Sequence, residues 1–176
     1  SSPADVKGLI RTALKSDNPT IFINHTALMG IEGEVPDGEF DIPFGQADVK
    51  RQGTDVTAVA LSRMVHRTLE AAEIVAAEGI DTEVVDPRTA APLDGEGICA
   101  SVAKTGRLVT VEEAIGPCSI GSEIAATVAE HAFGALKAPI VRLARAPVPV
   151  PFSPPLEDAI TPSVEDIAAA IRKVVG

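Results

Sequence analysis

The stretch VTAVALSRMVHRTLEAAEIVAAEGIDTEVVD, residues 56–86, decides the fold. It opens with a continuous apolar run, Val56–Leu61, which is typical of a strand buried on both faces. Ser62 is placed to cap a helix whose apolar stripe consists of Val65, Leu69, Ala72 and Ala76. The segment TEVVD, Thr82–Asp86, is expected to be a second strand and completes a strand–helix–strand unit. Such a unit predicts two parallel strands joined by a right-handed crossover.

The same alternation continues toward the C-terminus. Two more strands are expected at Arg107–Val111 and Pro139–Ala144. Helices are expected at Asp94–Lys104, after a cap at Ser122, and from Ser163, where Asp166 has the spacing of a capping box. We therefore predict an α/β fold, with a mostly parallel sheet and helices on both faces.

Proline dominates the segment before the last helix. Five prolines lie between Pro147 and Pro155. Because proline removes a backbone donor and clashes with the preceding turn, this spacing excludes both a helix and a central strand. The segment is expected to run extended over the surface.

The first fifty residues follow a different pattern. They predict one helix (about Ala4–Ser16), one strand (Thr20–Asn24) and a glycine-rich connection, with a linker near Gln46–Gly53. One helix and one strand cannot bury their own apolar faces. We therefore expect residues 1–50 to be a helix–strand remnant at the end of a preceding α/β domain plus its linker, and residues 51–176 to form a separate domain.

Composition excludes several classes of partner. The chain is 45% apolar but only 3% aromatic, so its core must consist of Val, Ile, Leu and Ala. A net charge of −10 argues against nucleic acid, which is bound through Lys and Arg. No apolar run approaches the roughly 20 residues that span a bilayer, so no membrane partner is expected. Two cysteines make a disulfide framework improbable and indicate a reducing, cytoplasmic location.

The segment GRLVTVEEAIGPCSIGSEIAA, residues 106–126, is a strand, a glycine-framed loop and a helix. Gly116 and Gly121 have the spacing of a phosphate-binding loop, but Ser122 and Glu123 stand where Lys and Ser or Thr are required. The loop is therefore interpreted as a tight connection and helix cap.

Two adjacent carboxylates, Glu112 and Glu113, precede this loop. Neighbouring strand residues point to opposite faces, so the pair cannot flank one reacting bond. Either one of them faces the crevice beyond the strand ends, or both are solvated or paired with Arg88 or Arg107.

The remaining reactive side chains do not form a motif. His25, His66 and His131 lack the spacing of metal ligands. Cys118 follows a proline near a helix N-terminus, but no histidine lies near it in the sequence. The residues alone describe an α/β domain without a self-sufficient active site, and we assign no catalytic and no cofactor-binding residue.

Several motifs in order resemble a known family. They are NPTIFINHTALMGIEGEVPDGEF, VVDPRTAAPLD, KTGRLVTVEEA, GSEIAA and PVPFSPPLE. Together they resemble the second half of the β subunit of thiamine-diphosphate-dependent 2-oxo acid dehydrogenases and cover essentially the whole chain. The segments EEAIGPCSIGSEIAA, AFGALKAPI and PVPFSPPLED are most similar to acetoin dehydrogenases, with the pyruvate type close behind.

The resemblance implies a transketolase-like C-terminal domain from about Gln52 to Gly176, after the end of a pyrimidine-binding domain. Thiamine diphosphate and magnesium would bind the intact complex through residues that precede this segment, so the isolated chain is expected to be inactive. A structural potassium is implied at the helix end formed by Ala13, Leu14, Ser16 and Asn18. Ser16 stands where Asp is usual, and capping by water is the alternative.

The implied partners are an α subunit and a second β subunit in an α₂β₂ assembly, and a dihydrolipoyl acyltransferase core. Pro147 replaces the usual Asp near the docking region. The implied function is that of the C-terminal part of an oxidoreductase β subunit, chiefly in assembly and docking. The alternative is a free-standing α/β module that binds a small anion through Arg88 or Arg145 without catalysis.

Overall fold

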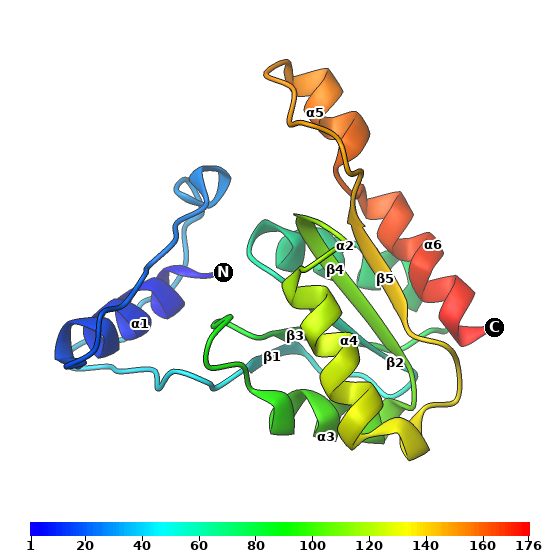
Figure 1. Cartoon of the computed structure of the whole chain (residues 1–176), viewed down its shortest axis with the longest axis horizontal. Coiled ribbons are helices and arrows are strands. Elements are labelled where there is room, and N and C mark those ends of the chain that lie inside the picture. The colour runs from blue at the N-terminus through cyan, green and yellow to red at the C-terminus, as the bar shows by residue number, and fades with distance from the viewer.

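A computed structural model describes residues 1–176. Its centre is a five-stranded sheet with the order β1-β3-β2-β4-β5 (Figure 1). The strands are β1 (Asp48–Arg51), β2 (Val56–Ala60), β3 (Thr82–Asp86), β4 (Leu108–Ile115) and β5 (Val141–Arg145). Strands β2 to β5 pair in parallel, and β1 alone runs antiparallel, against β3. The predicted mostly parallel sheet is confirmed.

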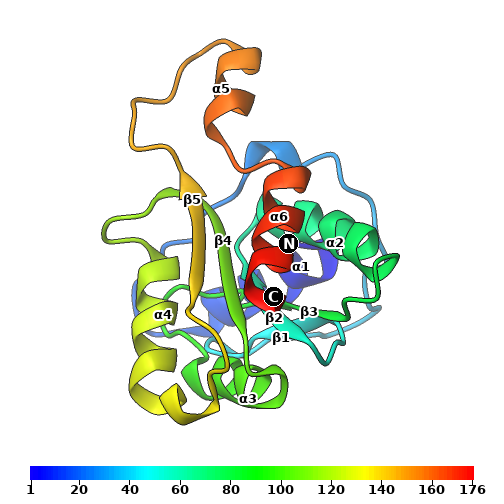
Figure 2. The ribbon, with the colours of Figure 1, turned by 90° about the vertical axis from the view of Figure 1, so that its right-hand side faces the viewer.

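Helices cover both faces of this sheet (Figure 2). The helices of the chain are α1 (Pro3–Lys15), α2 (Arg63–Ala76), α3 (Gly95–Thr105), α4 (Ile120–His131), α5 (Pro154–Ile160) and α6 (Val164–Val175), with 3₁₀ turns at Thr26–Leu28 and Phe133–Ala135. Helices α2 and α6 pack on one face, and α3 and α4 pack on the other. None of these helices is long and apolar enough to cross a membrane.

The core is divided into two apolar clusters, one on each face. Met64 of α2 and Ile171 of α6 meet Val109 and Val111 of β4 on the first face. Ile98 of α3 and Ile124 of α4 belong to the second cluster. Every residue of β2 and β3 is buried, including Glu83 and Asp86 of β3, as expected for strands covered on both faces.

Two of the three expected helix caps differ from the prediction. The capping box of Ser163 and Asp166 is confirmed. Ser62 makes no capping bond, because its φ of 56° turns the chain sharply between β2 and α2. Helix α4 is capped by Ser119 and not by Ser122, whose hydroxyl donates to the Gly116 carbonyl at 2.6 Å.

The proline-rich segment contains a helix that the prediction excluded. Up to Ser153 it runs without regular structure, but α5 begins at Pro154 and Pro155. Proline is tolerated in the first turn, where a backbone donor has no helical partner. Figure 1 shows α5 standing away from the sheet.

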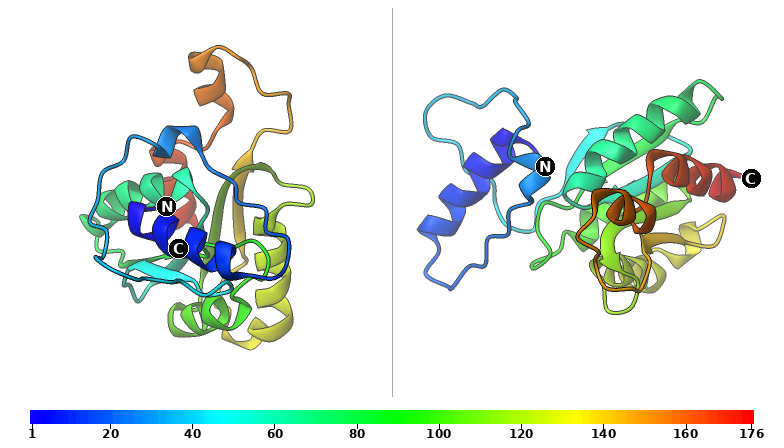
Figure 3. Two further views of the ribbon diagram at one scale, coloured as in Figure 1. Left: turned by 90° about the vertical axis from the view of Figure 1, so that its left-hand side faces the viewer. Right: turned by 90° about the horizontal axis from the view of Figure 1, so that it is seen from above.

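The N-terminal region lies beside the β1–β3 edge, outside the two helical layers (Figure 3). The predicted helix is present as α1, but the predicted strand Thr20–Asn24 is wrong, because this segment has no strand to pair with. Its Ile21 and Ile23 side chains are 89% and 87% exposed. The predicted linker, Gln46–Gly53, contains β1, whose polar sequence has no strand periodicity.

Candidate functional site

A buried carboxylate occupies the N-terminus of α4. Glu112 is 3% exposed and accepts hydrogen bonds from the Ser119 hydroxyl at 2.5 Å and the Gly121 N–H at 3.2 Å. A Cβ atom added to Gly121 would lie 2.3 Å from Oε1 of Glu112. The protein's own carboxylate therefore lies where a phosphate-binding loop would hold its anion. The loop acts as a connection and helix cap.

The next carboxylate points to the opposite face, as strand geometry requires. Glu113 lies 2.7 Å from Nε2 of His25 and 3.6 Å from the Arg63 guanidinium. The predicted alternative, pairing of these carboxylates with Arg88 or Arg107, is wrong. Arg88 pairs with Asp5 and Asp48, and Arg107 donates to backbone carbonyls.

The contacts of His25 define its tautomer. Its Nδ1 accepts the N–H of Ala27 at 3.1 Å, so the ring proton of the neutral form lies on Nε2 and is donated to Glu113. Both nitrogens are thus engaged, and neither is available as a general base. The pair instead joins the N-terminal segment to β4.

The other histidines are remote from this pair. Nε2 of His66 contacts the Ser1 carbonyl at 2.9 Å, and His131 is exposed beside Glu130. No group of three His, Cys, Asp or Glu side chains is arranged to hold a metal ion. Both cysteines are free; Cys118 is exposed, while burial raises the pKa of the Cys99 thiol.

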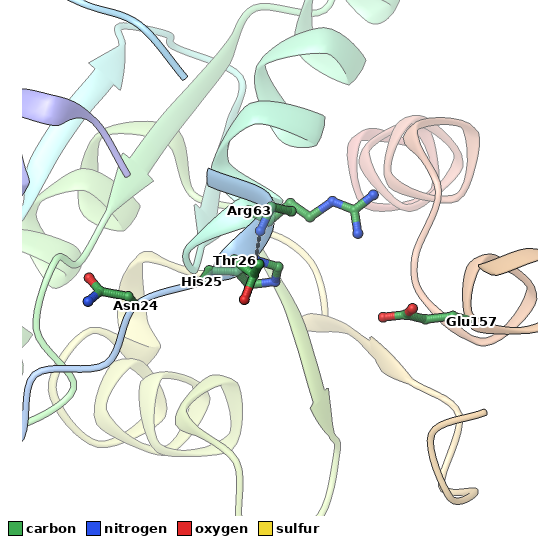
Figure 4. Close-up of a pocket in the computed structure, with 6 residues that line it drawn as sticks. Asn24, His25, Thr26, Arg63 and Glu157 are labelled. Carbon is green, nitrogen blue, oxygen red and sulfur yellow. Dashed lines mark hydrogen bonds between the residues drawn. The ribbon is translucent and has the colours of Figure 1, made fainter. Parts of the chain in front are cut away.

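A hollow of about 560 Å³ lies next to the His25–Glu113 pair (Figure 4). It opens where the turn after β2, the N-terminal segment and α5 approach one another. Its lining consists of Asn24, His25, Thr26, Ala27, Arg63 and Glu157. Sequence patterns could not reveal this group, because its members come from three distant segments.

A cluster of charges fastens α1 to the sheet edge. The Asp5 carboxylate, 2% exposed, accepts from Lys50 and Arg88, each at 2.8 Å. Burial alone would raise the pKa of Asp5, but hydrogen bonds from Lys50 and Ser2 hold it well below its usual range. Burial would lower the pKa of Lys50, and its bonds to Asp48 and Asp5 raise it instead.

A second buried carboxylate was also missed from the sequence. Glu83 is 1% exposed in β3 and bonds to Ser101 and Lys104 of α3. Its position in the strand TEVVD, between Thr82 and Val84, was the available signal. Because both Glu83 carboxylate oxygens bond to side chains of α3, the role of Glu83 is to hold α3 on the sheet.

Neither arginine of the anion-binding alternative is free. Arg88 is occupied by two carboxylates, and Arg145 donates to the carbonyls of Glu113 and Val148. This geometry disfavours a strand-end anion site built on either residue.

The four residues of the expected potassium site lie together at the end of α1. The Ala13 carbonyl accepts the Ser16 N–H at 3.2 Å, and the Ser16 hydroxyl accepts the Asn18 N–H at the same distance. Leu14 is 82% exposed. Carbonyl and hydroxyl oxygens are ligands that suit a hard cation.

The fold and sequence together define the class of protein. The family model of the transketolase C-terminal domain matches residues 45–167, and the chain belongs to this family. It is 51% identical to the β subunit of acetoin:2,6-dichlorophenolindophenol oxidoreductase from Cupriavidus necator, over 99% of this chain and 52% of that subunit. It is 43% identical to the pyruvate dehydrogenase E1 component β subunit of Dictyostelium discoideum, over 98% of this chain and 50% of that subunit.

These relatives confirm the resemblance to dehydrogenase β subunits, and the chain spans about half of their length. A solved split-gene transketolase, described as an inactive beta4 tetramer, superposes with a TM-score of 0.70 and 32% identity. That match covers 81% of this chain and 46% of the other. It confirms a transketolase-like fold.

Proposed function

We propose that this chain is the C-terminal region of the β subunit of a thiamine-diphosphate-dependent dehydrogenase that acts on acetoin or pyruvate. The observation that carries the proposal is 51% identity to an acetoin oxidoreductase β subunit over 99% of the chain. Acetoin is named first on the strength of this one relative, since a second acetoin-type relative is 42% identical and the pyruvate-type relative is 43% identical.

Within such an enzyme this region would act as scaffold and contact surface. Thiamine diphosphate would supply the electron sink for cleavage of the bond next to a carbonyl. Its diphosphate would be held through Mg²⁺, which takes oxygen ligands. The proposal assigns binding of both groups to residues that precede this segment in the intact subunit.

An exposed apolar strip supports a role in assembly. Residues of the proline-rich segment alternate, so that Val148, Val150 and Phe152 recur at every second position between prolines. Their side chains are 45%, 58% and 103% exposed. A stiff segment loses little entropy on binding, and large exposed apolar groups mark interaction surfaces. The proposed partners are the α subunit, a second β subunit and the acyltransferase core.

The proposal includes a division of the chain at about residue 50. Residues 1–50 would end the pyrimidine-binding domain, and residues 51–176 would form the transketolase C-terminal domain. The family model of the C-terminal domain, which begins at residue 45, supports this division. Two free cysteines support a cytoplasmic location. A potassium ion at Ala13, Leu14, Ser16 and Asn18 is also proposed.

A chimera tests the proposed function. The matching half of the Cupriavidus β subunit is replaced by this chain, and acetoin-dependent reduction of 2,6-dichlorophenolindophenol is measured with the cognate α subunit. We expect activity that requires added thiamine diphosphate. A folded chimera that assembles with the α subunit but lacks turnover would contradict the proposal.

A further inference from the structure

Arg63 differs from every other arginine of the chain. Each of the others donates at least one guanidinium hydrogen bond to a carboxylate, carbonyl or hydroxyl oxygen. Arg63 makes none, and its nearest charged partner, Glu113, lies at 3.6 Å. Glu113 is already engaged by His25 at 2.7 Å. A guanidinium with free donors is thus held at the start of α2.

The carboxylate of Glu157 adds a negative charge without an ion-pair partner to the lining of the hollow. Glu157 of α5 lines it together with Arg63, and the Glu157 carboxylate has no ion-pair partner, whereas the neighbouring Asp158 pairs with Arg67. Figure 4 shows both side chains extending into the space between α2 and α5. The amide of Asn24 adds an uncharged donor and acceptor on the third side.

We propose that this hollow binds a small zwitterion with one carboxylate and one ammonium group, the class that includes free amino acids. Arg63 takes the carboxylate through two parallel N–H donors, and Glu157 takes the ammonium. A volume of about 560 Å³ leaves room for such a molecule. A polyanion is disfavoured, since Glu157 lines the same hollow as Arg63 and Glu113 lies 3.6 Å from the Arg63 guanidinium. The proposal is independent of the function proposed above.

The test uses NMR titration of the ¹⁵N-labelled 176-residue chain at constant ionic strength. The probes are acetate, methylammonium and the series from glycine through 4-aminobutyrate to 6-aminohexanoate, which spaces the two charges progressively. We expect at least one zwitterion to bind more tightly than acetate, with shifts centred on residues 24–27 and 62–64.

Four variants assign the contacts. Arg63→Ala should weaken binding of acetate and of the zwitterion by about tenfold or more, and Arg63→Lys should restore only part of it. Glu157→Gln should reduce the zwitterion to the affinity of acetate. Arg172→Ala is the matched control, because Arg172 pairs with Glu78 beyond the other end of α2 and should leave binding unchanged.

Three results would overturn the proposal. The first is zwitterions that bind no more tightly than acetate, and the second is binding that survives Arg63→Ala. The third is acetate binding that is absent from the wild-type chain and appears in the Glu157→Gln variant. The last result would show that Arg63 and Glu157 pair directly in solution. A negative NMR titration would refute the zwitterion site and leave the proposed function untouched. A chimera without turnover would refute the proposed function and leave the result of the titration unchanged.

Discussion

Substituting Gly121 by Ala tests the internal carboxylate at the start of α4. The new methyl group would lie 2.3 Å from Oε1 of Glu112 and 2.9 Å from Oγ1 of Thr110. Both groups are buried, so neither can move aside into solvent. The Glu112 side chain would have to shift, and its bonds to Ser119 and to the Gly121 N–H would lengthen.

The expected loss follows from three contributions. Overpacking of a core costs about 1–3 kcal/mol, and weakening one hydrogen bond to a charged group costs about 1.5–3 kcal/mol. The higher helix propensity of Ala returns about 1 kcal/mol. The Gly121→Ala chain should therefore be less stable by about 3 kcal/mol, which corresponds to a fall in Tm of roughly 6–12 °C for a chain of this size.

The assay is urea unfolding followed by circular dichroism, with Gly134→Ala as the control. A Cβ atom at Gly134 meets nothing within 4 Å, so this variant should remain within about 0.5 kcal/mol of the wild type. If Gly121→Ala unfolds at the same urea concentration as Gly134→Ala, the proposed role of Glu112 is wrong.

Three further predictions concern the charged cluster, the cation site and the apolar strip. Asp5→Asn should cost about 1.5–3 kcal/mol at pH 7, because it removes the buried carboxylate that accepts from Lys50 and Arg88 and leaves Asp48 as their remaining anionic partner. Since the folded-state pKa of Asp5 is lowered, its contribution to the free energy of unfolding is present above the unfolded pKa near 4 and is lost as pH falls below it. Urea unfolding from pH 7 to pH 2 should show the stability difference between the wild type and Asp5→Asn narrowing, and a constant difference would contradict this. KCl should raise Tm above choline chloride at equal ionic strength, and more so in Ser16→Asp; identical melting in both salts for both proteins would argue against the potassium site. Phe152→Ser should leave Tm unchanged, because the ring is 103% exposed, while reducing recovery of the chimera with its α subunit; full recovery would remove the strip from the interface.

The sheet could be predicted because strands buried on both faces are rich in apolar residues. Val56–Leu61 is largely apolar and Thr82–Asp86 contains two adjacent valines, and these segments form β2 and β3 with nearly the expected bounds. Edge strand β1 escaped prediction because DVKR is polar and exposed on one side. The segment Thr20–Asn24 has strand periodicity, but a strand needs a neighbour, and this chain supplies none.

Local capping was only partly predictable. Ser119 and Ser122 both suit a helix start, and the choice depends on Glu112, which reaches the loop from β4. The position of α5 shows a similar limit, because prolines that break a helix interior are accepted in its first turn.

The hollow lay beyond sequence reasoning. The His25–Glu113 contact joins residues 88 positions apart, and Glu157 comes from a third segment. Only the fold brings these side chains together. By contrast, the absence of a complete thiamine site was an expectation from the motifs, and it still requires a direct test.

That test is calorimetric titration of the 176-residue chain with thiamine diphosphate and Mg²⁺, coupled to an assay of acetoin and pyruvate turnover. If this region serves as scaffold and contact surface, the chain alone should show neither saturable binding nor turnover. Saturable binding accompanied by thiamine-dependent turnover would contradict the account.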